Sequence, residues 1–289
     1  LQSARFHSSG NIDGQVGTLA LSCKYGENAY QAPAGLYATG SRDPLALDTF
    51  RVIQGTAPSY NNLCDLDRLL QTLTHIAAGF QKNFLYIPKI AIGVKHGNAC
   101  GVGVDETDPT KSLMRMIDGD PRALMGGLVI TNFGLNPELV EVLLTHGMPE
   151  GKRRLLDGVI VPSVREDALS ALKRKGDKCR IITNQALETE ACSLLDQHPR
   201  FRYVRGGFLK QPNYTFVLQT HDVEGVDRIN HEQERDFLIA WAIGSTSNSN
   251  TITLVKNQQL IGNGVGQQDR VGAAELAIKR ARDAGHHVN

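Results

Sequence analysis

Apolar residues recur along this chain at two spacings, one typical of amphipathic helices and one of buried strands. Leucine and isoleucine return every three or four positions over residues 63–81, which predicts a long helix. Short apolar runs predict buried strands at 89–95, 127–131, 158–161 and 179–183. Helical patterns between these runs predict helices at 108–117, 137–146 and 165–175. This alternation predicts an α/β fold in layers around a largely buried sheet.

The pattern changes after the polar stretch at 196–200, and a domain boundary is predicted near Arg200. Beyond it we expect strands at 203–210 and 251–262, helices at 232–243 and 271–284, and a crossing loop or short edge strand at 212–225. Residues 1–20 are polar and rich in glycine and serine, which predicts an arm. The expected divisions are therefore an arm at 1–20, a first subdomain at 21–199 and a second at 200–289.

Composition and charge restrict the classes of protein to which the chain can belong. Its 289 residues carry a net charge of +1, so no overall field attracts it to nucleic acid. No run approaches the roughly 18 apolar residues that a membrane helix needs. Five widely spaced cysteines without a C-x-x-C pair argue against a disulfide framework or a zinc site and favour a reducing, cytoplasmic location. We therefore expect no nucleic-acid or membrane partner.

Two polar clusters combine a cation with other hydrogen-bonding groups. Lys95 and His96 end the predicted strand at 89–95 and place a positive charge beside a side chain that titrates near neutral pH. Lys24, Tyr25 and Gly26 could bind a phosphate through charge and a hydroxyl. Considered singly, the first is more often a solvated strand end and the second a surface turn.

Two further clusters adjoin predicted helices. Asn62 lies where it could cap the helix at 63–81 or donate to a ribose or amide. Asn250 opens a predicted strand, and the glycine-rich turn at 262–268 precedes the last helix, where free backbone N–H groups can bind an anion or amide. Neither pattern is specific alone, since the strand, glycine and acidic-residue order of a dinucleotide fold is not met.

Taken together and in order, eight motifs resemble the AICAR transformylase domain of the bifunctional AICAR transformylase/IMP cyclohydrolase family. They are K-Y-G-E-N-x-x-Q (24–31), S-Y-N-N (59–62), V-K-H-x-N-x-C-G (94–101), the D-P to G-G segment (120–127), D-G-V-I-V-P (157–162), R-G-G (205–207), S-N (249–250) and G-x-G-x-G-Q-x-x-R (262–270). The resemblance extends over about residues 21–284.

This resemblance implies two cytidine-deaminase-like α/β subdomains in an intertwined homodimer with active sites at the interface. The zinc signature of true deaminases is absent from the sequence, so no metal is expected. The implied reaction transfers a formyl group from the co-substrate 10-formyltetrahydrofolate to the 5-amino group of the nucleotide AICAR.

The resemblance also implies roles for individual residues. By position in the motifs, His96 would be the general base and Lys95 its electrostatic partner or proton donor, while Asn250 would orient the carboxamide or formyl oxygen. The implied nucleotide-binding residues are Lys24, Tyr25, Gly26, Asn62, Gly126 and Gly127. The implied folate-binding residues are Gly266 and Gln267.

Some features depart from the family pattern and keep alternatives open. Lys24 stands where the family has Arg, and lysine cannot make a bidentate phosphate contact. Family members carry a cyclohydrolase domain before this region and a tail after it, so we expect either a fragment of a longer protein or a shortened relative. The alternatives are a non-catalytic purine-nucleotide-binding paralogue or scaffold subunit, and a formyltransferase acting on a different amino substrate.

Overall fold

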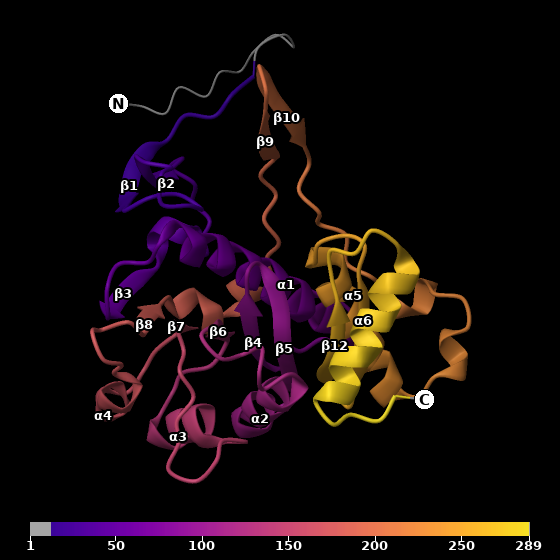
Figure 1. The fold of residues 1–289 in the computed structure, drawn as a ribbon. Coiled ribbons are helices and arrows are strands. Elements are labelled where there is room, and N and C mark those ends of the chain that lie inside the picture. Colours follow the sequence, from indigo (N-terminus) through magenta and orange to yellow (C-terminus); the bar gives the residue numbers. More distant parts are fainter. Residues whose placement is uncertain (1–12, 289) are drawn as a thin grey trace.

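An eight-stranded mixed sheet forms the centre of the fold (Figure 1). We analysed a computed structural model that describes residues 13–288. The strand order across the sheet is β11-β12-β5-β4-β6-β7-β8-β3. The strands are β3 (Arg51–Gln54), β4 (Lys89–Lys95), β5 (Asn98–Asp105), β6 (Leu128–Thr131), β7 (Gly158–Val161), β8 (Arg180–Thr183), β11 (Ile252–Lys256) and β12 (Gln259–Gly264).

Helices cover both faces of this sheet. Long helix α1 (Tyr60–Phe84) and α5 (His231–Thr246) pack together against one face, where their leucines and isoleucines form a core with β4 and β5. A second core on the opposite face lies under α2 (Pro109–Gly119), α3 (Pro137–Thr145) and the single turn α4 (Glu166–Leu169). Helix α6 (Arg270–Asp283) packs on β12. The predicted α/β layers are confirmed.

Strands β6, β7 and β8 are parallel, and all residues of β6 and β7 and the two central residues of β8 are buried. Strands that are buried on both faces have continuous apolar sequences rather than alternating ones. The short apolar runs in the sequence therefore predict these three strands correctly. The predicted helix at 63–81 is confirmed and extended. Its first turn carries a capping box in which the Ser59 side chain accepts from the backbone N–H of Asn62 and the Asn62 side chain accepts from that of Ser59.

The helix predicted at 165–175 is wrong in length. Only α4 and a following 3₁₀ turn at Ser170–Leu172 form, and Lys173 is already extended. Ala168 and Leu172 fill the core one turn apart, but the basic residues after them have no apolar face to bury. A short helix without such a face gains too little from packing to offset the entropy of ordering it.

Two single strands predicted in the second half are hairpins instead. The 203–210 segment belongs to β9 (Arg200–Val204) and β10 (Gly207–Gln211), and 251–262 to β11 and β12. Asn257 and Gln258, with φ of 54° and 60°, turn the second hairpin as a primed two-residue turn does. A turn this short leaves the apolar pattern almost uninterrupted. Residues 212–225 hold a 3₁₀ turn at Thr220–Asp222 and no strand.

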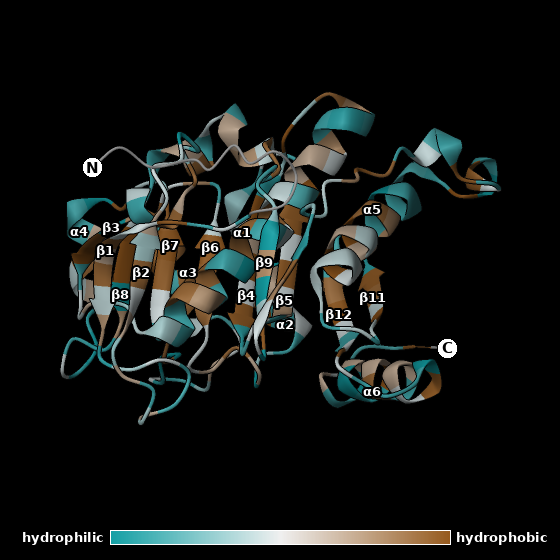
Figure 2. Cartoon of the chain, turned by 90° about the horizontal axis from the view of Figure 1, so that it is seen from above, coloured by the Kyte–Doolittle hydropathy of each residue, from teal (hydrophilic) through white to brown (hydrophobic). Residues whose placement is uncertain are grey.

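Hairpins β9–β10 and β1 (Thr18–Cys23) with β2 (Ala34–Ala38) stand apart from the central sheet (Figure 1). Most of the expected arm at 1–20 lies outside the described residues, and its last three residues begin β1. The sheet itself continues past the boundary expected near Arg200, because β12 pairs with β5 through Gln259 and Gly103. Figure 2 shows β11, β12 and α6 gathered to one side of the other layers. Cytidine-deaminase-like subdomains and their boundary stay a prediction.

No helix in the part of the chain that the structure describes is long and apolar enough to cross a membrane.

Glycines in β5 allow α2 to approach the sheet closely. A Cβ atom on Gly103 would lie 2.1 Å from the carbonyl oxygen of Ser112, and one on Gly101 would lie 2.1 Å from that of Met116. These contacts involve helix backbone, which cannot move aside as a flexible side chain can. Side chains at both positions would therefore force the helix away from the sheet.

We predict that Gly103→Ala lowers the free energy of unfolding by about 2–3 kcal/mol, because overpacking displaces α2. Chemical denaturation measures this change. Gly207→Ala is the matched control, since a Cβ there meets nothing within 4 Å, and it should change stability by less than about 0.5 kcal/mol. Equal stability of the two variants would contradict the close approach.

Candidate functional site

The edge of the sheet where β4 ends carries Lys95 and His96, the pair that the sequence predicts to be catalytic. Strand β4 is antiparallel to β6, and β6, β7 and β8 are parallel, so the end of β4 lies beside the beginnings of these three strands. His96 and Gly97 form the turn between β4 and β5, with φ of 52° and 71°. His96 therefore occupies the tip of a tight two-residue hairpin.

A carboxylate on α1 holds this turn in place. The backbone N–H of Gly97 donates to Oδ1 of Asp65 at 2.6 Å. Burial raises the pKa of Asp65, while the Gly97 hydrogen bond and the nearby His96 act in the opposite direction. A half-buried carboxylate thus lies close to the imidazole and fixes the backbone that carries it.

His96 opens onto a cleft of about 770 Å³, which we call the His96 cleft. Its walls come from α1, the His96–Gly97 turn, the loop before β2 and the segment after α5; representative lining residues are Glu27, Tyr60, Cys64, Asp65, His96 and Asn248. Burial raises the pKa of the Cys64 thiol, and neighbouring carboxylates raise it further. This thiol is therefore protonated at neutral pH and is a poor nucleophile.

Sequence reasoning named the S-Y-N-N motif at the start of α1, whose Tyr60 and Asn61 line this cleft, but missed the residues that follow it on the helix. Asn61, Cys64, Asp65 and Arg68 all line it and follow one another at helical spacing, on the side away from the buried leucines. That polar stripe was visible in the sequence. Nothing in the sequence showed that the end of β4 would lie against it.

The side chain of Lys95 does not line the His96 cleft and instead contacts the segment that precedes β6. Its ammonium donates to the carbonyl oxygen of Met125 at 2.7 Å. Gly126 and Gly127 follow directly, and Gly127 lies against the backbone of β4, where a Cβ would be 2.7 Å from the Val94 carbonyl oxygen. The structure therefore brings Lys95 together with Gly126 and Gly127.

Asn250 belongs to a third group with the glycine-rich turn. Its side-chain nitrogen donates to the carbonyl oxygens of Gln267 and Gln268 at 3.0 and 3.2 Å. The backbone N–H of Gly266 donates to the carbonyl oxygen of Asn248 at 2.9 Å. Asn250 and the expected folate-binding residues thus meet, and Asn248 of the same segment reaches the His96 cleft.

The remaining expected binding residues lie near the cleft without lining it. Lys24 and Tyr25 are solvent-exposed, and Gly26 closes a turn by donating to the Gln31 carbonyl oxygen at 2.8 Å. Glu27, the next residue, lines the cleft instead. The side chain of Asn62 takes part in the capping box of α1, so the helix-capping role predicted for it from the sequence is confirmed. Its nucleotide role stays a prediction.

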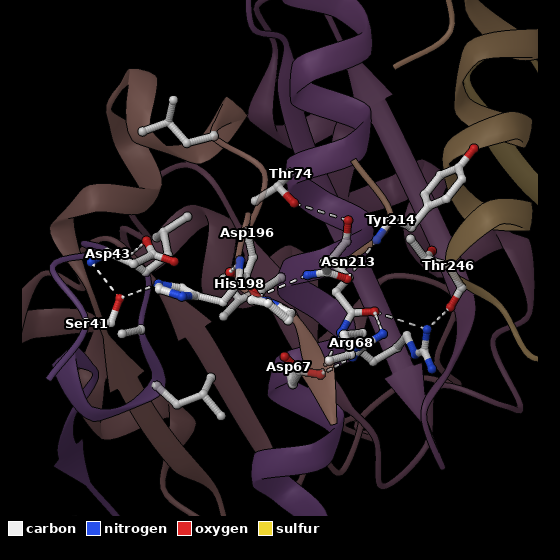
Figure 3. A pocket seen from close by; sticks show the side chains of 18 of the residues that line it. Ser41, Asp43, Asp67, Arg68, Thr74, Asp196, His198, Asn213, Tyr214 and Thr246 are labelled. Atoms are coloured by element: carbon white, nitrogen blue, oxygen red, sulfur yellow. Dashed lines mark hydrogen bonds and ion pairs between the residues drawn. The ribbon is translucent and has the colours of Figure 1, made fainter. Parts of the chain in front are cut away.

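A second cavity of about 350 Å³ follows the His96 cleft along α1, and Asp67 and Arg68 line both (Figure 3). Arg68 donates to the carbonyl oxygen of Thr246, and Arg200 pairs with Asp67 at 3.2 Å. His75 is buried there, and burial lowers its pKa. Its Nδ1 lies 2.7 Å from the Gln71 carbonyl oxygen. Because a carbonyl only accepts, Nδ1 carries a proton in this contact.

Among residues 13–288, no group of three or more His, Cys, Asp or Glu side chains is arranged to hold a metal ion. The side chains that line the His96 cleft include an imidazole, a carboxylate and amides, which can transfer protons and form hydrogen bonds. The five cysteines are free thiols, and four of them are buried.

Comparisons with known proteins agree with the family resemblance that the motifs indicate. The chain matches the family described as AICARFT/IMPCHase bienzyme over residues 4–280. It is 31% identical over 264 residues to the bifunctional purine biosynthesis protein PurH of Anoxybacillus flavithermus, covering 91% of this chain and 47% of that protein. It is 28% identical over 267 residues to PurH of Staphylococcus aureus strain JH1, covering 92% of this chain and 49% of that protein. The chain thus spans about half the length of these relatives. It belongs to the AICARFT/IMPCHase bienzyme family.

Proposed function

We propose that this chain transfers a formyl group from 10-formyltetrahydrofolate to the 5-amino group of AICAR, as a step of purine biosynthesis in the cytoplasm. Family membership supports the reaction class, and PurH relatives are named for purine biosynthesis. The observation that carries the proposal is the imidazole of His96 at the mouth of a cleft, on a turn that Asp65 holds.

The chemistry of the amine explains why a base is needed. The lone pair of the 5-amino group delocalises into the imidazole carboxamide, so the nitrogen attacks a formyl carbon only as it loses a proton. A neutral imidazole accepts that proton, and a positioned base of this kind contributes about 10²–10⁴-fold. Asp65 stabilises the imidazolium that results, since opposite charges attract strongly where water is partly excluded.

Two other charges develop during the transfer. The tetrahedral intermediate carries an oxyanion, and the departing folate nitrogen takes up a proton. Lys95 supplies positive charge for these groups beside Gly126, where its ammonium now rests on the Met125 carbonyl oxygen. Asn250 orients the carboxamide or formyl oxygen. Lys24 and Tyr25 contact the phosphate, and Gly266 and Gln267 the folate.

These groups do not share one cavity within a single chain, and we propose that a second copy completes the site in a homodimer. Exposed apolar side chains on the β9–β10 hairpin support this: Tyr203 is 82% exposed and Leu209 60%. Phe208 of the same hairpin is also exposed. Several exposed apolar side chains on one hairpin are typical of an interaction surface.

A non-catalytic nucleotide-binding protein is the second candidate. The observation that favours it is the hydrogen bond that holds the Lys95 ammonium at Met125, outside the His96 cleft. Calorimetry with AICAR, followed by an assay with 10-formyltetrahydrofolate, separates the candidates. Nucleotide binding without turnover would favour this second candidate and contradict our first.

We predict that His96→Asn lowers kcat for AICAR formylation by at least about a hundredfold, because the base is lost. Asparagine is chosen because it tolerates the left-handed backbone at this position. Steady-state rates of tetrahydrofolate release measure the effect. His287→Asn, an exposed histidine near the chain end, is the control and should retain native rates. A native rate in His96→Asn would remove this imidazole from the mechanism.

We predict that Asp65→Asn raises stability at neutral pH while lowering kcat at least about tenfold, because asparagine keeps the acceptor for Gly97 but loses the charge. The folded state raises the pKa of Asp65, so it binds more protons than the unfolded state between the ordinary and the raised pKa. Native stability therefore falls as pH rises through that window.

Melting temperatures from pH 7 down to about 4 test this sign: the advantage of Asp65→Asn should shrink as the native carboxylate becomes protonated. Asp48→Asn, at an exposed carboxylate, is the matched control and should show neither change. A variant that melts lower than the native protein at pH 7, or that keeps its full rate, would show that the carboxylate is merely structural.

We predict that inactive His96→Asn and Asn250→Ala chains regain activity when they are unfolded together and refolded as mixed dimers. If each site takes these residues from different copies, half of the dimers are mixed and each holds one intact site, giving about a quarter of native activity. The variants refolded separately and then assayed together are the control. Zero recovery in mixed dimers would place both residues of a site on one chain.

A further inference from the structure

A third cavity, of about 600 Å³, lies on the sheet face opposite α1 and the His96 cleft. It opens between the loop that follows α3 and the loop that follows α4. Its floor is apolar and consists of Leu144, Leu156, Leu172 and Cys179, which belong to the core under α3 and α4. Burial raises the pKa of Cys179 to about 11, so its thiol adds no negative charge at the base.

The walls of this cavity are strongly basic. Its lining includes Arg153, Arg154, Lys173, Arg174, Lys175 and Lys178 but no acidic residue, and we call it the cationic pocket. Glu141 pairs with Arg153 and Asp157 with Arg174, both at 2.7 Å. The three lysines have no ion-pair partner among the described residues. A chain whose net charge is only +1 therefore gathers an uncompensated positive charge here.

Arg154 is the buried member of this set, with 2% of its surface exposed. Its two terminal nitrogens donate to the carbonyl oxygens of Leu143 and His146, at 2.6 and 2.7 Å, at the end of α3. Its Nε has no hydrogen-bond partner, and among the described residues Arg154 forms no salt bridge. Burial lowers the pKa of the Arg154 guanidinium, and the Asp118 carboxylate opposes this only in part. A buried charge without an ion-pair partner is costly.

We propose that the cationic pocket binds a small organic anion whose apolar body covers the leucine floor and whose phosphate or carboxylate group faces the lysines. An anion there would offset the charge that Arg154 and the lysines leave unpaired. The apolar floor distinguishes this ligand from a free inorganic ion, because burying hydrocarbon against apolar side chains is favourable. The pocket lies on the other face of the sheet from His96, so this inference is independent of the proposed formyl transfer.

The probes are 2-naphthyl phosphate and 2-naphthoate, which share an apolar body and differ in the charged group. Isothermal titration to the full chain measures affinity, with neutral 2-naphthalenemethanol and inorganic phosphate as comparisons. We expect at least one naphthyl anion to bind about tenfold or more tightly than both comparisons, and to weaken as salt is added. The naphthyl anion that binds more tightly shows whether the pocket prefers a phosphate or a carboxylate group. Equal affinity for the neutral alcohol, or for inorganic phosphate, would overturn the proposal.

Two pairs of lysine substitutions localise the binding. Lys173→Gln/Lys178→Gln removes two charges from the pocket and should weaken the naphthyl anion about tenfold. Lys82→Gln/Lys256→Gln removes the same charge from exposed positions elsewhere and should leave the affinity unchanged. Leu155→Gln, at a half-exposed wall residue, should also weaken binding. All of these positions are at the surface, and matching melting temperatures verify folding. Equal affinities in the two lysine pairs would contradict the assignment.

Discussion

The hydrogen bond from the Gly97 backbone to Asp65 joins two parts of the molecule that the chain otherwise builds separately. The end of β4 is determined by strand pairing, while Asp65 belongs to the first turns of α1. One carboxylate oxygen fixes the hairpin tip on the helix, and its charge lies beside the imidazole that the tip carries. Without that contact His96 would end a solvated turn, the simpler interpretation of the motif. With it, the imidazole becomes part of a cleft wall.

Burial of Asp65 is unfavourable for its ionised form and raises the pKa of the carboxyl, although the hydrogen bond from Gly97 acts in the opposite direction. The ionised group is partly withdrawn from water and receives one N–H donor in return. Proteins retain such groups at sites where a charge is needed in a fixed position, and give up some stability for it. The same reasoning applies on the opposite face to Arg154, whose guanidinium is buried with carbonyls as its partners. The fold thus holds a partly buried carboxylate, Asp65, and a buried guanidinium, Arg154, on opposite faces of one sheet.

Glycines make this geometry possible at two kinds of position. At Gly97 and Gly126, φ of 71° and 73° turns the chain where most side chains would be strained. At Gly103 and Gly127, the absence of a Cβ lets other backbone segments approach. The second kind carries no local signal, since φ there is ordinary. Close approach between layers is therefore a property of the packed molecule that only coordinates reveal.

The apolar pattern alone determined the layered α/β fold and most helices and strands, because burial on one face or two leaves a period in the sequence. Motif order identified the family. The apolar pattern did not predict the two-residue turn at 257–258, which divides one expected strand into two. It also predicted helix after Leu172, where the chain forms an exposed loop. Tertiary structure decided which groups are in contact. Lys95 and His96, adjacent in sequence, have different surroundings, while the Asp65 carboxylate accepts a hydrogen bond from the Gly97 backbone. Lys95 is the last residue of β4, whereas His96 lies in the left-handed turn that follows it, so their side chains leave the backbone in different directions. Contacts across elements depend on how whole layers pack, which no short stretch of sequence encodes.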